Sequence, residues 1–462
     1  MKAEKYVDIV AYIISFCFIA AGVLVSLNRF WQYEAFYIDF GQYDQVLWRI
    51  SRFQEPIMHH FIHGNINVLG DHVTPTVFLL SPLYWFTERS EIILVAQAIV
   101  AGVSGLLLYD IAKHVLKDRL LSLSILVSYF LFEGLQNAVI TEFHELTIMT
   151  LPLMATIWAF VKNKKKLYFL SLILTLGCKE TTFPLGIGIG IALFFLRKDW
   201  GKISIATILI SIAWGLIAFK VILPYFSGDY LYGPSLPGGL LEKAYAFVDQ
   251  PIKRHTLFFS FFSFALLPFF APAFWIAILQ DYAGRFLTEY STTRWSLGMH
   301  YNAQSAVLLA VSSVYGLSFI LKKIRIKKQY LNIIGIIIVL NAVFLFRFVL
   351  HGPFLLALNK VFYEHTKDFV FLDTMIAKVP KEAVVMTQNN LATRFTHQEV
   401  YLLKVDYKTI NPDYILIDNR KGQNANNYFG GSNIEAVLAR LNKDKRYTII
   451  YNTGDQKIFK KI

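Results

Sequence analysis

The stretch YVDIVAYIISFCFIAAGVLVSLN, residues 6–28, decides the class of this protein. It carries a single charged residue, Asp8, and it is long enough for the roughly 20 residues that a membrane-spanning helix needs. The core of a signal peptide is shorter, and further apolar stretches follow this one, so we expect an uncleaved membrane anchor. Because Lys2 and Lys5 precede it, the positive-inside rule predicts a cytoplasmic N-terminus.

The rest of the chain has the composition of an integral plasma-membrane protein. Of its 462 residues, 55% are hydrophobic and 17% are charged, which is too little polar surface for a water-soluble fold. The net charge of +13 comes from basic residues in short runs between apolar stretches, as in cytoplasmic loops. Membrane lipid is therefore an expected partner and nucleic acid is not. Cys17 and Cys178 lie far apart in apolar surroundings, which excludes a disulfide framework and a cysteine-based metal site.

Further apolar spans predict a polytopic α-helical protein. They are expected near 91–112, 120–137, 146–161, 167–178, 182–197, 203–223, 303–321 and 329–350. The basic runs between them, at 113–119, 162–166, 197–202 and 322–328, belong on the cytoplasmic side by the positive-inside rule.

The sidedness of the basic runs fixes the number of crossings. An even number must separate Lys202 from Lys322, because both are placed inside. The apolar block 256–287 therefore crosses twice, as two short helices joined by a turn at Pro268 and Pro272, which break a helix. The prediction is about eleven transmembrane helices, an extracytoplasmic C-terminus, and outer segments at 29–90 and 224–255.

From about residue 351 the sequence changes character. Segments 383–387 and Tyr414–Asp418 are typical of strands, Ile434–Leu441 of a helix, and 447–451 with 457–460 of a hairpin. Residues 422–433, rich in Asn and Gly, are typical of a loop. This alternation predicts a small soluble α/β domain over 351–462, after a transmembrane domain over 1–350.

The first outer loop contains two candidate carboxylates. The apolar residues Phe40, Tyr43, Leu47 and Ile50 share one helical face, which predicts a helix along the membrane surface. Asp39 stands at its start, where an acid either caps the helix or acts chemically at the water–lipid boundary. Asp44 lies about 140° further round a regular helix, so we expect one of the two to act rather than both as a pair.

Histidines and acids follow this helix. His59, His60 and His63 are explained as solvated or hydrogen-bonded loop residues, because surface histidines are common. Asp71 and His72 are stronger candidates, since Gly70 and Pro75 imply a fixed turn around them. Imidazole with carboxylate is a usual ligand set for a divalent metal ion.

Three further outer boundaries carry ionisable residues, which are costly at a helix end unless they are solvated, paired or functional. They are Glu142 with His144 and Glu145, the pair Lys179-Glu180, and His300. Four cations also lie at outer ends of spans, against the positive-inside bias: Arg29, Lys179, Lys220 and Arg347. Such cations either snorkel from helix ends or hold an anion, for which phosphate is the natural candidate.

The sequence resembles a large prokaryotic family of predicted membrane proteins of unknown function that is related to GT-C glycosyltransferases. The matching stretches are DFGQYDQVLW at 39–48, Gly70-Asp71-His72, Pro82-Leu83-Tyr84, Phe143-His144, Lys179-Glu180, His300-Tyr301 and the region from Val379-Pro380 to Asp418. The chain departs from the family pattern at Glu142, Glu145 and Thr181, where an Asp, a proline and an acid are expected.

The resemblance implies a GT-C-like fold and an inverting sugar transfer from a polyprenyl-phosphate donor to an acceptor of unknown identity on the outer face. It also implies that the base is an acid of the first outer loop, the place that Asp39 holds. From the residues of the same loop, Asp44 is the second candidate for a catalytic carboxylate. We expect Lys179, Lys220, Arg347 and Arg29 to bind the donor phosphate, Glu142, Glu180 and His300 to lie near the acceptor, and Asp71, His72 and His144 to hold a divalent metal ion. Asp39, Asp71, Glu142 and His144 should then converge in space.

Two other classes of protein stay open. A lipid or glycolipid transporter or flippase would also be polytopic, but it should show internal repeats and ionisable residues near the middle of the membrane. A non-catalytic membrane scaffold that displays the C-terminal domain would keep its function when Asp39, Asp71 and His144 are replaced by alanine.

The predicted sidedness has a direct test in a background where Cys17 and Cys178 are replaced by serine. Single cysteines at Lys164 and Lys323 should react with a membrane-impermeant thiol reagent only after lysis, because both positions are expected inside. A cysteine at Asn426 should react in intact cells. Protection of position 426 in intact cells would contradict the odd number of crossings.

Overall fold

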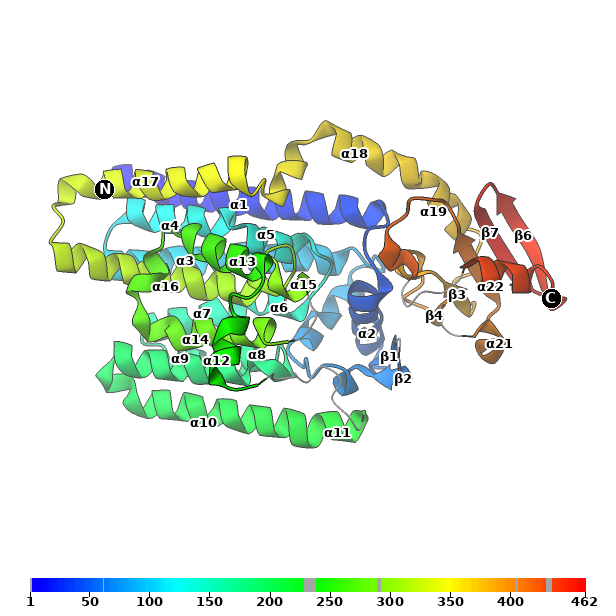
Figure 1. The fold of residues 1–462 in the computed structure, drawn as a ribbon, viewed down its shortest axis with the longest axis horizontal. Helices are drawn as coiled ribbons and strands as arrows, with labels where there is room; N and C mark the ends of the chain where they lie inside the picture. The colour runs from blue at the N-terminus through cyan, green and yellow to red at the C-terminus, as the bar shows by residue number, and fades with distance from the viewer. Residues whose placement is uncertain (1, 61, 228–237, 289–291, 404–405, 429–433) are drawn as a thin grey trace. The chain divides into compact units, whose positions relative to one another are not determined.

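The computed structural model describes residues 2–60, 62–227, 238–288, 292–403, 406–428 and 434–462 (Figure 1). Contacts divide the chain into two compact units. Unit 1 consists of Met1–Val25, Leu69–Leu79 and Val95–Leu358, and unit 2 of Ser26–Val68, Leu80–Leu94 and Asn359–Ile462.

Long apolar helices identify an integral membrane protein. Five in the described chain are long and apolar enough to cross a membrane: Lys5–Trp31, Ile92–Leu116, Lys198–Phe226, Asn302–Ile324 and Lys328–Val349. They contain α1 (Lys2–Trp31), α3 (Ile92–Leu116), α10 (Gly201–Ile217) with η6 (Ala218–Ile222) and α11 (Leu223–Phe226), α16 (Asn302–Ile324), and α17 (Leu331–Phe344) with η10 (Leu345–Val349). A sixth results if α4 (Arg119–Leu131) and α5 (Glu133–Ile140), bent by 50°, form one span. In Figure 1, α3, α4, α16 and α17 of unit 1 run lengthwise in a common direction.

The other expected spans are shorter helices, so five or six candidate spans are present where about eleven are expected. These helices are α6 (Glu145–Ile148) with α7 (Thr150–Val161), α8 (Lys165–Leu176), α9 (Phe183–Leu196), α13 (Pro251–Phe262) and α14 (Trp275–Phe286). A helix of 12 residues such as α8 is about 18 Å long, against roughly 30 Å of hydrocarbon in a bilayer.

The predicted break in the block 256–287 is confirmed. The short helices η7 (Leu267–Phe270) and η8 (Pro272–Phe274), each with a proline in its first turn, separate α13 from α14. Of the predicted outer segment 224–255, residues 228–237 lie outside the described residues, and α12 (Leu240–Ala246) follows them.

Glycines let two helices of unit 1 approach closely. A Cβ at Gly186 of α9 would lie 2.1 Å from Oγ of Ser211, and one at Gly190 would lie 2.9 Å from the carbonyl oxygen of Ser204, both on α10. Small residues at helix interfaces are the usual means of tight packing in lipid. Helix α9, which η4 (Glu180–Thr182) precedes, is thus packed closely against α10.

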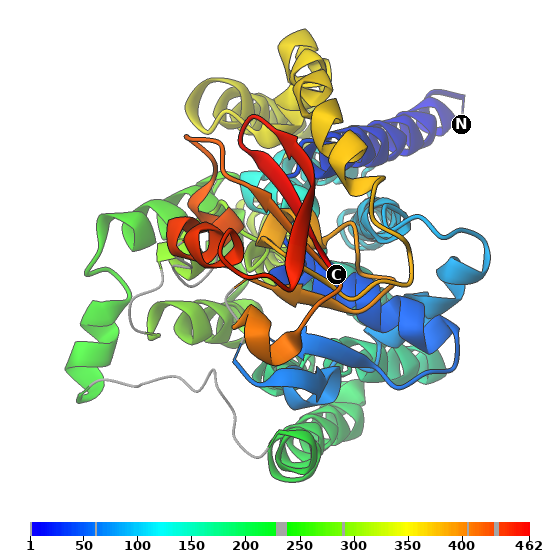
Figure 2. The ribbon, with the colours of Figure 1, turned by 90° about the vertical axis from the view of Figure 1, so that its right-hand side faces the viewer.

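Unit 2 contains the predicted α/β fold. Its five-stranded sheet has the order β4-β3-β5-β7-β6, in which β3 is parallel to β4 and β5, and β7 is antiparallel to β5 and β6. The strands are β3 (Val385–Thr387), β4 (Val400–Leu402), β5 (Tyr414–Asp418), β6 (Tyr447–Thr453) and β7 (Gln456–Lys461). The predicted C-terminal hairpin is confirmed and is drawn in red in Figure 2.

The remaining elements of unit 2 include both predicted and unexpected ones. They include α2 (Gln42–Ser51), β1 (Ile57–His60), β2 (Gly64–Asn67), α18 (Lys360–Thr366), α19 (Val370–Ile376), α20 (Asn389–Ala392), α21 (Tyr407–Ile410), η13 (Ala425–Tyr428) and α22 (Ile434–Leu441). The predicted helix Ile434–Leu441 is confirmed as α22. Within the predicted loop at 422–433, residues 429–433 lie outside the described residues. His59 and His60, expected in a loop, are buried and lie in β1.

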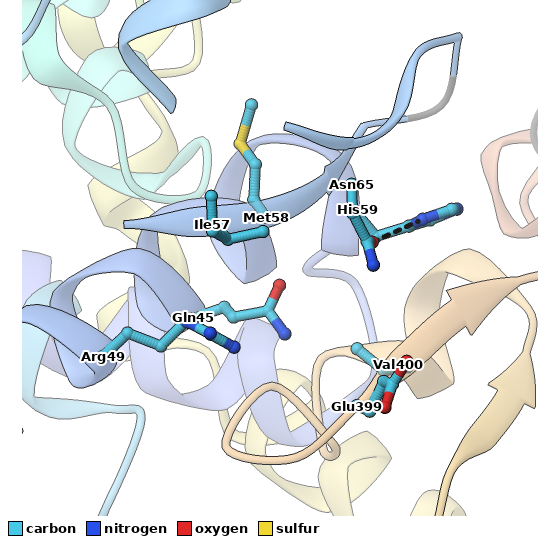
Figure 3. A pocket seen from close by; sticks show the side chains of 8 residues that line it. All are labelled: Gln45, Arg49, Ile57, Met58, His59, Asn65, Glu399 and Val400. Atoms are coloured by element: carbon cyan, nitrogen blue, oxygen red, sulfur yellow. Dashed lines mark hydrogen bonds between the residues drawn. The ribbon is translucent and has the colours of Figure 1, made fainter. Parts of the chain in front are cut away.

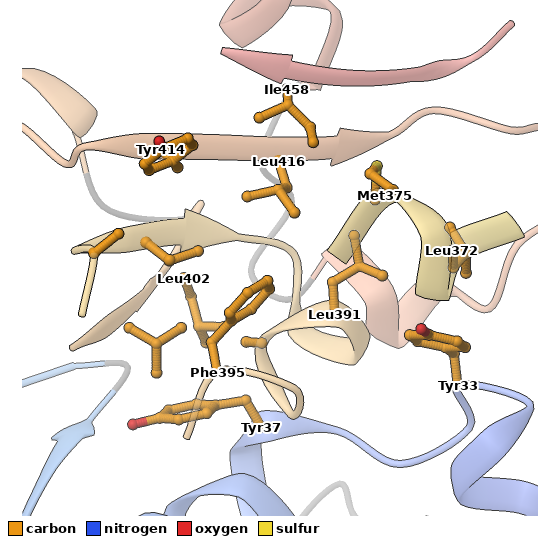
Figure 4. Close-up of a cluster of buried hydrophobic side chains, with 14 residues drawn as sticks. Tyr33, Tyr37, Leu372, Met375, Leu391, Phe395, Leu402, Tyr414, Leu416 and Ile458 are labelled. Atoms are coloured by element: carbon orange, nitrogen blue, oxygen red, sulfur yellow. The ribbon is translucent and has the colours of Figure 1, made fainter. Parts of the chain in front are cut away.

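The first loop and the C-terminal sheet share one hydrophobic core. Figure 4 shows Tyr33 and Tyr37 of the loop packed with Phe395, Leu402 and Ile458 of the C-terminal part. Helix α2 belongs to the same unit with seven of its ten residues buried, so it packs inside protein instead of lying along the membrane surface as predicted. The α/β fold predicted for 351–462 is therefore completed by residues 26–68 and 80–94.

Candidate functional site

Six ionisable side chains of unit 1 gather where helices begin, and we name them the acid–base cluster. They are His72 in the loop after η2 (Val68–Gly70), His144 and Glu145 at the start of α6, Lys179 and Glu180 ahead of α9, and His300 ahead of α16. All six stand in stretches that the sequence singles out.

Local backbone geometry turns these side chains toward one another. His144 and Lys179 are extended residues that precede helices, with φ of −141° and −162°. The loop that carries His72 is tied to the end of α8 by Thr76. The N–H of Thr76 donates to the carbonyl of Gly177 at 3.0 Å, and its hydroxyl donates to the carbonyl of Leu174 at 2.8 Å.

Two buried ion pairs form the centre of the cluster. Nζ of Lys179 lies 2.5 Å from Oε1 of Glu145, and Nδ1 of His72 lies 3.1 Å from Oε1 of Glu180. The other carboxylate oxygen of Glu180 accepts the N–H of Val73 at 3.0 Å. Glu145 and Glu180 are 2% and 0% exposed, so each carboxylate depends on its partner, because an unpaired buried charge is costly.

Burial and neighbouring charges set the protonation of the cluster. Burial works against a charged Lys179, but the carboxylates of Glu145 and Glu180 outweigh it and raise the pKa of the amine. Burial and Lys179 likewise oppose a charged His72, but Asp71 and Glu180 outweigh them and raise the pKa of the imidazole. Burial and the neighbouring His144 hold the pKa of His300 well below its ordinary value. Within one cluster, the neighbouring carboxylates thus favour the charged forms of Lys179 and His72, whereas burial disfavours the charged form of His300.

The two remaining histidines of the cluster stack on each other. The ring centroids of His144 and His300 are 3.4 Å apart, with 21° between the planes. The N–H of His144 donates to Oε1 of Gln97 at 2.8 Å, and Nε2 of Gln97 donates to the carbonyl of Glu142 at 2.6 Å. The turn at Glu142, with a φ of 54°, is therefore fixed to α3. Asp39 belongs to unit 2, so its predicted convergence with Asp71, Glu142 and His144 stays a prediction.

The residues expected to hold a metal ion serve other partners. Nδ1 of His72 is engaged by Glu180, and the ring of His144 lies against that of His300. Among the described residues, no three or more His, Cys, Asp or Glu side chains are placed to hold a metal ion. Zinc sites usually draw at least three ligands from the protein. The predicted metal role of Asp71, His72 and His144 therefore stays a prediction, and we assign no chemical step to a metal ion.

Asp39 occupies a strained backbone position in unit 2. Its φ of 88° and ψ of −86° interrupt η1 (Tyr37–Gly41) and lie near a γ-turn that is rare because it is strained. Such a conformation costs on the order of 1–3 kcal/mol in a residue other than glycine. Its neighbours enforce it, because Tyr37 and Phe40 are fully buried and the N–H of Ile38 donates to Oδ1 of Asn389 at 3.1 Å. The Asp39 side chain is partly exposed, and no described residue donates a hydrogen bond to its carboxylate.

Asp44, in contrast, is completely buried and ties unit 2 together. Its carboxylate accepts hydrogen bonds from the hydroxyls of Tyr84 and Thr396, and Oδ2 lies 3.3 Å from Nε2 of His397. The His397 ring stacks on Trp48, with centroids 5.0 Å apart. Burial disfavours the charged form of Asp44, but His397 and the two hydroxyls outweigh it and hold the pKa of the carboxyl below its ordinary value. Its role as a second catalytic acid stays a prediction.

The four cations expected at the donor phosphate differ in placement. Lys179 is committed to the acid–base cluster, whereas Lys220 in η6 and Arg347 in η10 are exposed near the ends of two candidate spans of unit 1. Arg29, in unit 2, has its Nε 3.4 Å from a carboxylate oxygen of Glu34. Of these four, Lys220 and Arg347 are the most accessible to a ligand.

Sequence reasoning missed the side chains that hold the two loop carboxylates in place. Asn389, which fixes Ile38, and Thr396, which donates to Asp44, lie 351 and 352 residues further along the chain. No spacing rule connects positions so distant. The one available signal is Tyr84, which stands in the matching stretch Pro82-Leu83-Tyr84.

Comparison with known families places the chain in one of them. The profile of a family described as predicted membrane protein (DUF2079) matches residues 31–456. That range contains Asp39, Asp44 and all of the acid–base cluster. No curated protein matches the chain.

We expect Asp44→Asn to lower stability more than Asp39→Asn does. The first change leaves three donors without a charged acceptor, a loss of about 3 kcal/mol for a broken buried pair. The second alters a partly exposed carboxylate. The measurement is the midpoint of thermal unfolding of the purified protein in detergent, followed by tryptophan fluorescence. Equal midpoints for the two variants would contradict the structural role of Asp44.

His72 should leave a pH signature on stability. Because its pKa is raised in the folded protein, its pairing with Glu180 stabilises the fold below the ordinary pKa of about 6.5, and this contribution is lost as the pH rises through the raised value. The difference in unfolding midpoint between wild type and His72→Gln should therefore shrink from acidic to alkaline pH. His63→Gln, at an exposed histidine, is the matched control. A difference in unfolding midpoint that grows with pH would contradict a raised pKa of His72 in the folded protein.

Proposed function

The chain belongs to the DUF2079 family of predicted membrane proteins, and from that premise we propose that it is an inverting membrane glycosyltransferase with a polyprenyl-phosphate-linked sugar as donor. The acceptor carries a hydroxyl group and is used on the outer face of the membrane. In this proposal the shorter apolar helices complete a GT-C-like bundle of about eleven spans.

One observation carries the proposal, namely the backbone of Asp39. Strained residues other than glycine persist where the surroundings over-determine them, and they concentrate at active sites. Asp39 combines such strain with a partly exposed carboxylate that no described residue engages. It also follows α1, the first candidate span, by only a few residues, which suits a substrate anchored in lipid.

The chemistry assigned to Asp39 is general-base catalysis. Its carboxylate takes the proton of the acceptor hydroxyl while that oxygen bonds to the anomeric carbon of the donor sugar. The bond from the same carbon to the phosphate oxygen breaks on the opposite side, so the configuration inverts and the polyprenyl phosphate departs with the electron pair. Cations near the phosphate stabilise the charge that develops on it.

Lys220 and Arg347 are the cations that we assign to the donor phosphate first. Both are exposed at the ends of apolar helices, where a lipid phosphate can reach them. Lys179 would have to exchange its 2.5 Å contact with Glu145 for the phosphate, so we place it second. Glu142, Glu180 and His300 remain proposed neighbours of the acceptor.

The acid–base cluster also favours a second candidate, a transporter or flippase. Buried ionisable groups among apolar helices mark ion and substrate pathways in membrane proteins. The pairs Lys179–Glu145 and His72–Glu180 are such groups. Charge-neutral variants of the cluster would then abolish lipid movement across vesicles while the Asp39→Asn variant leaves it unchanged.

We expect Asp39→Asn to abolish transfer of a labelled sugar by the purified protein in lipid. The change keeps the shape of the side chain but removes its basicity, and loss of a general base costs about 10²–10⁴-fold in rate. Donor affinity should stay within a few-fold of wild type, because the carboxylate acts on the acceptor. Asp368→Asn, at an exposed acid of the same unit, is the control.

The outcome separates the candidate functions. Full turnover by Asp39→Asn would reject Asp39 as the base. Absence of transfer by the wild-type protein over a broad panel of donors would reject the glycosyltransferase and favour the transporter or the scaffold.

A further inference from the structure

A cavity of about 230 Å³ lies within unit 2, between α2, the hairpin β1–β2 and the start of β4 (Figure 3). It is smaller than the roughly 300–1,000 Å³ of sites for drug-sized ligands, so its size suits a small metabolite or a lipid headgroup. Neither Asp39 nor Asp44 lines it, so the cavity is distinct from the proposed site of sugar transfer.

Two opposite charges line this cavity without neutralising each other. The guanidinium of Arg49 comes from the last turn of α2, and the carboxylate of Glu399 comes from the residue before β4. Nε of Arg49 donates to the carbonyl of Glu55 at 3.0 Å, and the Glu399 carboxylate accepts the hydroxyl of Tyr401. In the described part of the chain neither residue belongs to an ion pair. The terminal amines of Arg49 and one oxygen of Glu399 are thus open to a ligand.

Amides and apolar side chains supply the other walls. Oε1 of Gln45 accepts the hydroxyl of Tyr37 at 2.6 Å, and Nε2 donates to the carbonyl of Gln398 at 3.2 Å, so this amide is held in one orientation. Asn65 lies across the cavity on β2, as Figure 3 shows. His59, whose Nδ1 lies 3.4 Å from Oδ1 of Asn65, and the apolar Ile57, Met58 and Val400 complete the lining. Glu399 is exposed and Arg49 is partly buried, so a ligand can reach both charges from solvent.

We propose that this cavity binds a small zwitterion, with its anionic group on Arg49 and its primary ammonium group on Glu399. A guanidinium matches the geometry of a carboxylate or a phosphate, and an ammonium group supplies donors to a carboxylate. A purely anionic ligand would bring its charge beside Glu399, and a purely cationic one would bring its charge beside Arg49. A neutral polyol would leave both charges of the cavity without a counter-charge.

Two sources supply this chemistry. One is a free amino acid, and the other is ethanolamine phosphate, either free or as the headgroup of a lipid. They share an anion and a primary ammonium group joined by a short spacer. Binding does not depend on the proposed sugar transfer, so a chain that transfers no sugar should bind the zwitterion all the same.

The test is isothermal titration of the full-length protein in detergent with a series of ligands. Glycine, β-alanine and γ-aminobutyrate vary the spacer, O-phosphoethanolamine replaces the carboxylate by phosphate, and a short-chain phosphatidylethanolamine presents the same group on a lipid. N-acetylated and amidated analogues each remove one charge, and glycerol represents a polyol. We expect one spacer to be preferred and the single-charge analogues to bind at least about tenfold more weakly, as charge-assisted hydrogen bonds imply.

Two variants test which residue of the cavity binds each charge of the ligand. In Arg49→Gln, the amidated ligand should bind as well as the zwitterion, because the partner of the anion is gone. In Glu399→Gln, the N-acetylated ligand should bind as well as the zwitterion for the corresponding reason. Lys360→Gln and Glu364→Gln remove the charges of an exposed pair at 3.3 Å elsewhere in unit 2 and should leave binding unchanged.

Three results would overturn the proposal. They are the absence of binding by every zwitterion, binding of glycerol or single-charge analogues as tight as that of zwitterions, and unchanged discrimination in both Arg49→Gln and Glu399→Gln. Tighter binding of the phosphatidylethanolamine than of free O-phosphoethanolamine would identify the headgroup as the source. Because the analogue series uses wild-type protein, a variant that does not fold leaves the test intact.

Discussion

Hydrogen-bond donors from separate stretches of the chain meet at the carboxylate of Asp44, and the geometry of unit 2 depends on them. The hydroxyls of Tyr84 and Thr396 donate to it, and His397 lies at 3.3 Å. A fully buried carboxylate keeps its charge only if such donors replace the water that it has lost. These partners therefore hold the first loop against the C-terminal sheet together with the hydrophobic core that the two share. The strained backbone at Asp39 is maintained within the same framework, since Tyr37 on one side of it is part of the shared core.

The buried carboxylates of the acid–base cluster in unit 1 also need partners, but here the partners are basic side chains and not hydroxyl groups. The two buried carboxylates of this cluster are matched by Lys179 and His72 at short distances, so the charge of each carboxylate has a partner. Well-packed apolar residues would often serve stability as well as a buried ion pair does. Two buried pairs beside two stacked imidazoles are thus poorly explained by stability alone. This is why the cluster supports a functional role, either beside the proposed acceptor or in transport.

The sequence predicts those parts of the fold that depend on local patterns. The hairpin around Gly454, the strand Tyr414–Asp418 and the break at Pro268 and Pro272 are all confirmed, because turn residues and alternation act over a few positions. The three-residue strand β4 and the hairpin β1–β2 are too short for periodicity to identify. The length of a span is also set by where neighbouring helices pack and end, which explains why α8 is shorter than a full crossing.

The candidate site divides in the same way between local and distant causes. The cost of ionisable groups at helix ends is enough to single out His144, Lys179 and His300 in the sequence. Their pairings depend on how helices far apart in the sequence pack, and no pattern in the chain predicts them.

Burial distinguishes the two acids of the first loop, Asp39 and Asp44. Asp44 has its oxygens engaged by donors that lower the pKa of its carboxyl, whereas the partly exposed carboxylate of Asp39 is engaged by no described residue and is the more accessible of the two. A regular helix would place Asp39 and Asp44 about 140° apart. The backbone instead leaves helical geometry at Asp39, so that Asp44 is buried in α2 while Asp39 stays partly exposed.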